Sequence, residues 1–222
     1  MFNTIIVDFY LAFKIMFFVF VSSTSTVILY CKINNCPFYV EDNHIQHPKC
    51  VEYNSKKESK LVTILKNKAI VFTESVGCVT YLLHNNYILN EKHHFIYSGL
   101  NVTLYIVIIE FLYYSIHRLM HHRYLYNLVH KKHHEIYEVY PLDAFYVSLL
   151  DVNGTFASFI VPLVLLRLNV NEFIFVLYLY LTIIYISHSS TVFHHHIIHH
   201  KYLIYNYCLF LPIFDALFNT YK

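Results

Sequence analysis

The 222-residue sequence is poor in charge, in glycine and in tryptophan. Only 14% of its residues are charged and 57% are hydrophobic, whereas an ordinary soluble domain carries about 25% charged residues. This deficit excludes a disordered chain and argues against a soluble globule. The formal net charge is only +2, so the chain lacks the basic field typical of nucleic-acid-binding proteins. Three glycines and no tryptophan indicate few tight turns.

The cysteines of this chain do not form the closely spaced pairs that usually bind metals. The five cysteines form no C-x-x-C pair, and we expect them to be reduced, scattered thiols. Histidine, by contrast, is abundant: seventeen are present, and twelve of them lie between His117 and His200. Any metal site built from these histidines would therefore lack the thiolates of structural zinc sites.

Long apolar runs predict an integral membrane protein made of helices. A spanning helix needs about 20 mainly apolar residues, and open strands cannot satisfy their backbone groups in lipid. The candidate spans are residues 5–31, 69–89, 95–116, 144–166 and 173–187. The run 69–89 is the weakest, because Glu74 and His84 interrupt it. We therefore expect an all-α fold with four or five transmembrane helices. The alternative for the first run is a cleaved signal peptide, which Asp8 and the lack of a basic start disfavour.

The distribution of lysine predicts the orientation of the spans. Positively charged loops favour the cytoplasm, and the polar stretch 32–68 carries seven lysines. Two spans later, the basic segment 117–143 returns to the same side. The hairpin 144–187 then brings the tail 188–222 back to it as well. Both histidine-rich stretches should therefore form one cytoplasmic, histidine-rich cap.

Three histidine clusters have the spacing of a helix face. Residues 117 and 121 are i and i+4, and the clusters 130–134 and 196–200 each place histidines at i, i+3 and i+4. With His188, nine imidazoles are available, more than one four- to six-coordinate metal ion uses, whereas two ions can use them. Imidazole suits zinc, copper, iron and nickel alike. The number of ligands, the lack of cysteine and the position beside a membrane favour an oxygen-activating centre of two irons.

The order of these clusters resembles the fatty acid hydroxylase/sterol desaturase superfamily of membrane di-iron enzymes. Its boxes H-x3-H, H-x2-H-H and H-x2-H-H fall on the three clusters in sequence order. Shorter family elements match H-R-L at 117–119, Y-L-Y at 124–126, H-S at 188–189, N-Y at 206–207 and F-D-x-x-F-x-T at 214–220. The similarity runs from about Glu110 to Tyr221 and is greatest to the methylsterol monooxygenase branch, with sphingoid-base hydroxylases next.

This resemblance implies a set of metal ligands, cofactors and partners. The implied ligands are His117, His121, His130, His133, His134, His188, His196, His199 and His200. They would bind two iron ions, with O2 as co-substrate, for the hydroxylation or related oxidation of a lipid. A 4-methylsterol is the first expectation, and a sphingoid base or fatty acyl lipid is the alternative. The implied location is the endoplasmic reticulum membrane, with multiple spans. Residues 1–95 would form N-terminal spans and a polar loop, and residues 96–222 the catalytic domain.

The expected electron donors are a separate cytochrome b5 and its NAD(P)H-dependent reductase. The pair His47-Pro48 lacks the H-P-G-G of a fused cytochrome b5, so the chain itself is not expected to supply the haem.

The sequence departs from the family pattern at several positions. Ser190 and Asn219 replace glycines, and Glu110 stands where aspartate is usual. Only seven residues separate His188 from His196, fewer than the family provides in this access region. Two alternatives therefore stay open: a non-catalytic relative that keeps the histidines, and a membrane protein that handles zinc or another metal.

Two acids are assigned to the catalytic site. Glu110 lies seven residues before His117, on the same helical face, and an acid within a span is a functional candidate. We expect it either to orient an imidazole or to pair with Arg118 or Arg123. Asp215, from the closing motif, is expected to brace the third cluster.

The other histidines fall into two classes. His122, His194 and His195 crowd the clusters, and His195 has the best spacing because His199 follows at i+4. Isolated histidines are expected to be solvated or interfacial: His44, His47, His84, His93 and His94. Asn206 is expected to brace the third cluster together with Asp215.

Overall fold

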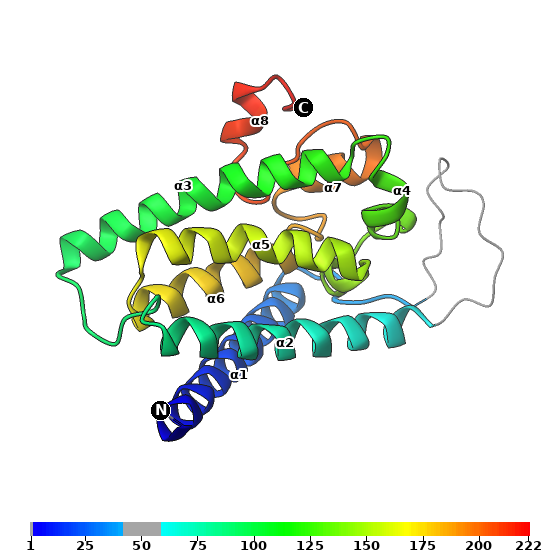
Figure 1. Cartoon of the computed structure of the whole chain (residues 1–222). Helices are drawn as coiled ribbons and strands as arrows, with labels where there is room; N and C mark the ends of the chain where they lie inside the picture. Colours follow the sequence, from blue (N-terminus) through cyan, green and yellow to red (C-terminus); the bar gives the residue numbers. More distant parts are fainter. Residues whose placement is uncertain (1, 42–58) are drawn as a thin grey trace.

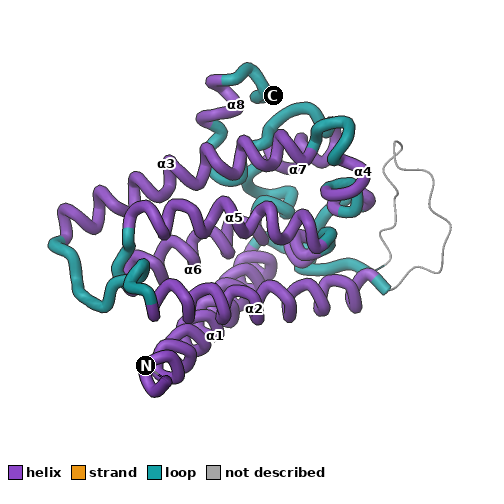
Figure 2. The backbone as a smooth tube through the Cα atoms, viewed as in Figure 1, coloured by secondary structure: helices purple, strands orange, loops and turns teal. Residues whose placement is uncertain are grey.

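The computed structural model describes residues 2–41 and 59–222. This part of the chain contains ten helical segments joined by loops (Figures 1 and 2). The long helices are α1 (Phe2–Ile33), α2 (Lys60–His84), α3 (Phe95–Met120), α5 (Leu149–Leu166) and α6 (Val170–Ile186). The short ones are α4 (Tyr126–Val129), η2 (His133–Glu135), η3 (Pro141–Phe145), α7 (His194–Tyr202) and α8 (Ile213–Leu217). The expectations for His44, His47-Pro48 and Cys50 lie outside the described residues.

Three of the long helices are long and apolar enough to cross a membrane: α1, α3 and α5. The fourth apolar helix, α6, has 17 residues, slightly fewer than a straight span needs. Helix α2 covers the weakest predicted span and does not reach the same apolarity. The all-α membrane class is confirmed, and the described residues hold three clear spans where four or five were expected.

The histidine-bearing segments lie at one end of the helices. Helix α1 packs against α2 and α6, and α3 packs against α5. In Figure 1, α3 ends, α5 begins and α6 ends beside α4 and α7. The connections 121–148 and 187–193 therefore meet at this end, as the hairpin 144–187 predicts.

Local polar contacts fix the hairpin between α5 and α6. Arg167, with φ 50°, ends α5 in the left-handed conformation. The Asn169 side chain accepts hydrogen bonds from the backbone N–H groups of Asn171 and Glu172, and the Glu172 carboxylate accepts one from the Asn169 N–H. This reciprocal capping box satisfies backbone N–H groups at the N-terminus of α6 and so fixes the residue at which the helix begins. At the other end of α5, the Ser148 hydroxyl caps the helix by accepting the N–H of Asp151.

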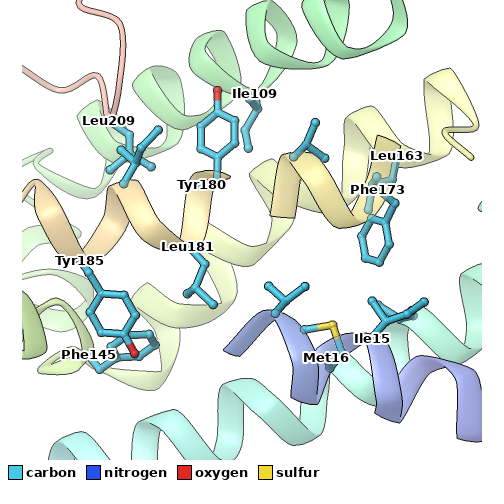
Figure 3. Close-up of a cluster of buried hydrophobic side chains, with 14 of the residues drawn as sticks. Ile15, Met16, Ile109, Phe145, Leu163, Phe173, Tyr180, Leu181, Tyr185 and Leu209 are labelled. Atoms are coloured by element: carbon cyan, nitrogen blue, oxygen red, sulfur yellow. The ribbon is translucent and has the colours of Figure 1, made fainter. Parts of the chain in front are cut away.

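Apolar side chains of different helices interlock in the centre of the bundle (Figure 3). Met16 of α1, Ile109 of α3 and Tyr180 of α6 are almost completely buried. The outer faces stay apolar too, since Phe17 and Phe18 of α1 are each 57% exposed. An apolar surface of this kind fits helices that face lipid.

The N-terminal part of α2 is tied to the histidine-bearing end by buried polar contacts. Lys60 Nζ lies 2.7 Å from Asp143 Oδ1, with both side chains 1% exposed, and it also donates to the carbonyl of Val40. About two turns further on, the Asn67 amide donates to the carbonyls of Phe145 and Val147. These contacts hold η3 against α2 and thereby set the path between the second histidine cluster and α5.

Candidate metal centre

Nine histidines form two adjacent groups in which the ligand-type atoms lie within 4.8 Å of one another. The first group contains His117, His121, His130, His134 and His199, and the second contains His133, His188, His196 and His200. The groups touch, because the rings of His134 and His200 have centroids 4.6 Å apart. The nine are the same residues that the sequence predicts as ligands. Eight of them are buried, and His121 is half-buried.

Neighbouring histidines point into different groups. The i, i+4 pairs stay together: His117 with His121, and His196 with His200. The prediction that residues 130, 133 and 134 share one helical face is wrong, because this segment is not a continuous α-helix. Helix α4 ends at Val129, and a 3-10 turn begins at His133. His133 lies in the second group and His134 in the first, and on the continuous helix α7 His199 is likewise separated from His196 and His200.

Two backbone carbonyls orient histidines of the first group. His117 Nδ1 lies 2.8 Å from the carbonyl oxygen of Tyr207, and His199 Nδ1 lies 2.7 Å from that of Tyr205. A carbonyl oxygen only accepts hydrogen bonds, so both Nδ1 atoms must carry the proton. In a neutral imidazole the lone pair is then on Nε2, which faces the centre of the group.

Two further histidines are oriented in the same way. His130 Nδ1 lies 2.6 Å from Asp151 Oδ2, and His188 Nδ1 lies 2.9 Å from the carbonyl oxygen of Ile184. A carboxylate or carbonyl on the outer nitrogen is the usual arrangement behind a metal-binding histidine, because it fixes the tautomer and the ring.

The inward nitrogens are spaced like ligands of a common ion. His117 Nε2 and His130 Nε2 lie 3.0 Å apart, although the outer hydrogen bonds leave a lone pair on each. Two lone pairs at this distance repel each other unless a cation lies between them. Imidazole nitrogens at roughly 2.1 Å from one metal, with bond angles between octahedral and tetrahedral, are about 3.0–3.4 Å apart.

The other contacts between inward nitrogens fall in the same interval. They measure 3.2 Å for His121–His134 and His134–His199, and 3.3 Å for His133–His188 and His188–His196. Both nitrogens of His200 in the second group are buried without a hydrogen-bond partner in the described structure. Such buried polar atoms are costly unless a ligand satisfies them, so the residues present fit bound metal ions.

Burial keeps these imidazoles neutral. Loss of solvent, reinforced by neighbouring imidazoles, holds the pKa of His133, His134 and His200 well below the usual value of histidine. The same causes, with the backbone contact to Ile184 opposing them, lower the pKa of His188 to about 4. A neutral imidazole is the form that binds metal.

The two predicted acids act on one C-terminal loop, residues 203–211. Asp215 accepts the N–H groups of Tyr207 and Cys208, at 2.8 and 2.7 Å. Glu110 accepts the N–H groups of Phe210 and Leu211 and the hydroxyl of Tyr180. Asp215 thus holds the backbone that presents a carbonyl to His117. We expected Glu110 to orient an imidazole or to pair with an arginine. That expectation is wrong, because its carboxylate binds Tyr180 and the backbone of the loop instead.

The other histidines among the described residues belong to neither group. His195 Nε2 lies 3.2 Å from the carbonyl oxygen of Leu209, so its role is in bracing the loop. Asn206 supports the same region by donating to the carbonyl of His195. At the opposite end of the helices, His93 contacts Glu172 and His84 contacts Asp8. Neither His122 nor His194 belongs to the groups.

The short interval between His188 and His196 does not separate the two residues. Their Nε2 atoms are 3.3 Å apart. The chain turns back at Phe193, whose φ of 57° is left-handed, and α7 starts at the next residue. The seven intervening residues are therefore enough to complete the second group.

Sequence reasoning missed Asp151 as a site residue. It is the only charged residue of the apolar run 144–166, and the rule applied to Glu110, that an acid in a span is a functional candidate, covers it equally. The carbonyls of Ile184, Tyr205 and Tyr207 have no side-chain signature, so no sequence pattern could have identified them.

Fold and site together define a helical membrane protein with two adjacent all-histidine groups that could each hold a metal ion. The model of the fatty acid hydroxylase family matches residues 102–220, a segment that contains all nine histidines. The chain belongs to this family.

Similar proteins act on lipids according to their names. The rice (Oryza sativa subsp. indica) very-long-chain aldehyde decarbonylase GL1-5 is 27% identical over 148 residues, covering 55% of this chain and 24% of the relative. The Schizosaccharomyces pombe Delta(7)-sterol 5(6)-desaturase erg32 is 28% identical over 143 residues, covering 60% of this chain and 43% of the relative. The chain therefore spans less than half the length of these relatives. No solved structure matches it significantly. The superfamily is confirmed, and the methylsterol monooxygenase branch is not.

Proposed function

We propose that the protein is a membrane di-iron oxidoreductase that uses O2 to oxidise a lipid. The observation that carries this proposal is the pair of histidine groups, with five and four ligand-type atoms within 4.8 Å. Nine histidines are more than one four- to six-coordinate metal ion can bind, and the two groups would supply five ligands to one ion and four to the other. Neutral imidazoles without thiolates suit iron and resist the oxidising conditions that O2 chemistry creates.

The protein residues would bind, orient and shield the metal ions. His117, His121, His130, His134 and His199 would hold one iron, and His133, His188, His196 and His200 the other. Bound iron would supply the one-electron and O2 chemistry that side chains lack. Asp151 and the carbonyls of the 203–211 loop keep the ligands in the correct tautomer. Burial of the imidazoles keeps bulk water away from the reacting region.

Inserting one oxygen atom of O2 into a C–H bond needs two electrons and two protons. These reduce the second oxygen atom to water. We propose that a separate cytochrome b5 and its NAD(P)H-dependent reductase deliver the electrons at the cytoplasmic face of the endoplasmic reticulum membrane. The family resemblance is what supports these partners and this location.

The substrate is proposed to be a membrane lipid. The names of the relatives, a sterol desaturase and a very-long-chain aldehyde decarbonylase, support a lipid and do not choose between a sterol and a long alkyl chain. A 4-methylsterol and a sphingoid base or fatty acyl lipid are therefore both carried forward.

Metal analysis of the purified full chain tests the proposal. We expect two irons per chain, with iron lost in His199→Ala and in His200→Ala, since each removes a ligand of a different group. His93→Ala, which alters a contact to Glu172 at the other end of the helices, should retain both irons. Zinc alone would favour a metal-handling protein, and no bound metal would favour a non-catalytic relative.

A further inference from the structure

Helix α8 packs on α3, and Figure 1 shows it on the side of α3 that is far from α1 and α2. The ring centroids of Phe214 and Phe111 lie 5.3 Å apart, and Phe218 stacks on Tyr114 at the same distance. Phe111 and Tyr114 belong to α3, one of the three clear spans. A short helix outside every predicted span is therefore packed against a membrane-spanning helix.

The level of this contact along α3 places α8 within the thickness of the membrane. Helix α3 has 26 residues, so it is about 39 Å long, roughly 9 Å longer than the hydrocarbon core of a bilayer is thick. Phe111 lies nine residues before the last residue of α3, which is about 14 Å along the helix axis. Even if the whole excess length projected at the histidine-bearing end, Phe111 would lie about 5 Å inside the hydrocarbon core, and a tilt of α3 would place it deeper.

The loop 203–211 descends along α3 before it reaches α8. The carbonyl oxygen of Tyr207 contacts His117, whereas the N–H groups of residues 210–211 donate to Glu110. Glu110 lies seven residues before His117, about 10 Å further from the histidine-bearing end of α3. The chain thus runs from the level of the histidine groups into the level of the span.

The amino acids of the segment suit that depth. Of residues 209–218, only Asp215 is not apolar, and its side chain is completely buried. The large side chains on the outer surface of α8 are apolar: Ile213, Leu217 and Phe218 are 53%, 66% and 44% exposed. This surface therefore continues the exposed apolar surface of α3.

Two buried carboxylates satisfy the backbone of the segment. Non-helical backbone at membrane depth is tolerated only where protein groups satisfy its hydrogen bonds or where it lines a water-filled cavity. Glu110 of α3 accepts the N–H groups of residues 210–211, and Asp215 accepts those of residues 207–208. These hydrogen bonds remove the main obstacle to placing an irregular loop at this depth.

We propose that residues 209–218 form a re-entrant membrane segment, in which α8 faces the acyl chains of the leaflet at the histidine-bearing end. The chain turns back at Asn219, whose φ of 56° is left-handed and which is the first exposed polar residue after α8. The hydrophobic effect favours this placement, because water would otherwise contact three large apolar side chains. The proposal goes beyond the proposed function and depends on neither the metal nor the reaction.

Tryptophan quenching in phosphatidylcholine nanodiscs tests the proposal. The chain has no tryptophan of its own, so a single substitution in the full chain reports one position. Leu217→Trp reports α8, Val107→Trp reports the lipid-facing surface of α3, and Tyr124→Trp reports the connection after α3. All three side chains are exposed, so none of these substitutions overfills a packed core. Phospholipid with brominated acyl chains quenches tryptophan that lies in lipid, and acrylamide quenches tryptophan that lies in water.

We expect Leu217→Trp to behave like Val107→Trp. Brominated lipid should quench both strongly, and acrylamide should quench both several-fold less than Tyr124→Trp. Acrylamide quenching of Leu217→Trp equal to that of Tyr124→Trp would place α8 in water and overturn the proposal. Protection of Leu217→Trp from both quenchers would show that a second copy of the chain or another protein covers α8, and would overturn it as well.

A second variant keeps the test decisive. Ile213→Trp lies on the same outer surface of α8 and gives the same reading if Leu217→Trp does not fold. Neither measurement needs iron, so the result is separate from that of the metal analysis. Lipid quenching of α8 in a chain without iron would support the re-entrant segment and remove the di-iron assignment, whereas two irons with α8 in water would do the reverse.

Discussion

Asp151 is the carboxylate that contacts His130, one of the proposed metal ligands. Its carboxylate accepts the Nδ1 proton of His130 at 2.6 Å, and both side chains are 4% exposed. A buried carboxylate in this position increases the basicity of the imidazole and prevents the other tautomer. The residue also lines the apolar pocket formed by residues of α1, α2, η3, α5 and α6.

Replacing Asp151 with asparagine should weaken iron binding. An amide accepts the His130 proton less strongly and can present its own N–H instead, and loss of such a partner costs about 10–100-fold in metal affinity. Competition with a chelator measures the affinity. The matched control is Asp8→Asn, which alters another aspartate–histidine contact, to His84 at 3.0 Å, away from the metal centre. Equal iron affinity in the two variants would show that Asp151 does not support the ligand.

At the level of single residues, the sequence predicts the ligands better than their arrangement. All nine histidines that the three clusters and His188 provide do converge. Spacing could not predict that His199 and His200 face different groups, because adjacent positions on a helix point about 100° apart and only the neighbouring segments decide which group each joins. Sequence spacing also could not predict the roles of Glu110 and Asp215, because both carboxylates accept hydrogen bonds from backbone amides of a loop.

At the level of elements, the connection 130–148 carries three of the nine histidines and has little regular structure. It contains a 3-10 turn at 133–135 and another at 141–145. Helical periodicity was therefore a poor guide here, while the length of the apolar runs served well for α3, α5 and α6. Contacts from α2 replace the missing regular hydrogen bonds, chiefly the Lys60–Asp143 pair and Asn67.

Breaking the Lys60–Asp143 pair should destabilise this connection. Burial raises the pKa of Asp143, and Lys60 opposes that shift. Lys60→Met would leave the carboxylate buried without its cation, which typically costs 3–5 kcal/mol, so roughly that loss of stability is expected. The double variant Lys60→Met/Asp143→Leu removes both charges and should recover most of the loss. Thermal unfolding in detergent measures both, and an unchanged Tm in Lys60→Met would contradict this role for the pair.

At the level of the whole molecule, every segment that contributes a ligand lies at one end of the helices. The ligands come from α3, the 121–148 connection, residue 188 and α7, and Figure 1 places these segments together. The hairpin of α5 and α6 makes this possible, because it carries the chain across and back between the second and third clusters. The counting of spans and lysines predicts this grouping, while the membrane side of the site is still a prediction.

Single-cysteine labelling in sealed microsomes tests the side of the membrane. In a background with the native cysteines replaced by serine, Glu138→Cys reports on the histidine-bearing end and Glu91→Cys on the opposite end, since both positions are exposed. The lysine-rich stretch 32–68 favours the cytoplasm for the first of these. We expect an impermeant maleimide to label Glu138→Cys in intact microsomes and Glu91→Cys only after detergent is added. The reversed pattern would place the metal centre in the lumen, where cytoplasmic electron donors cannot reach it.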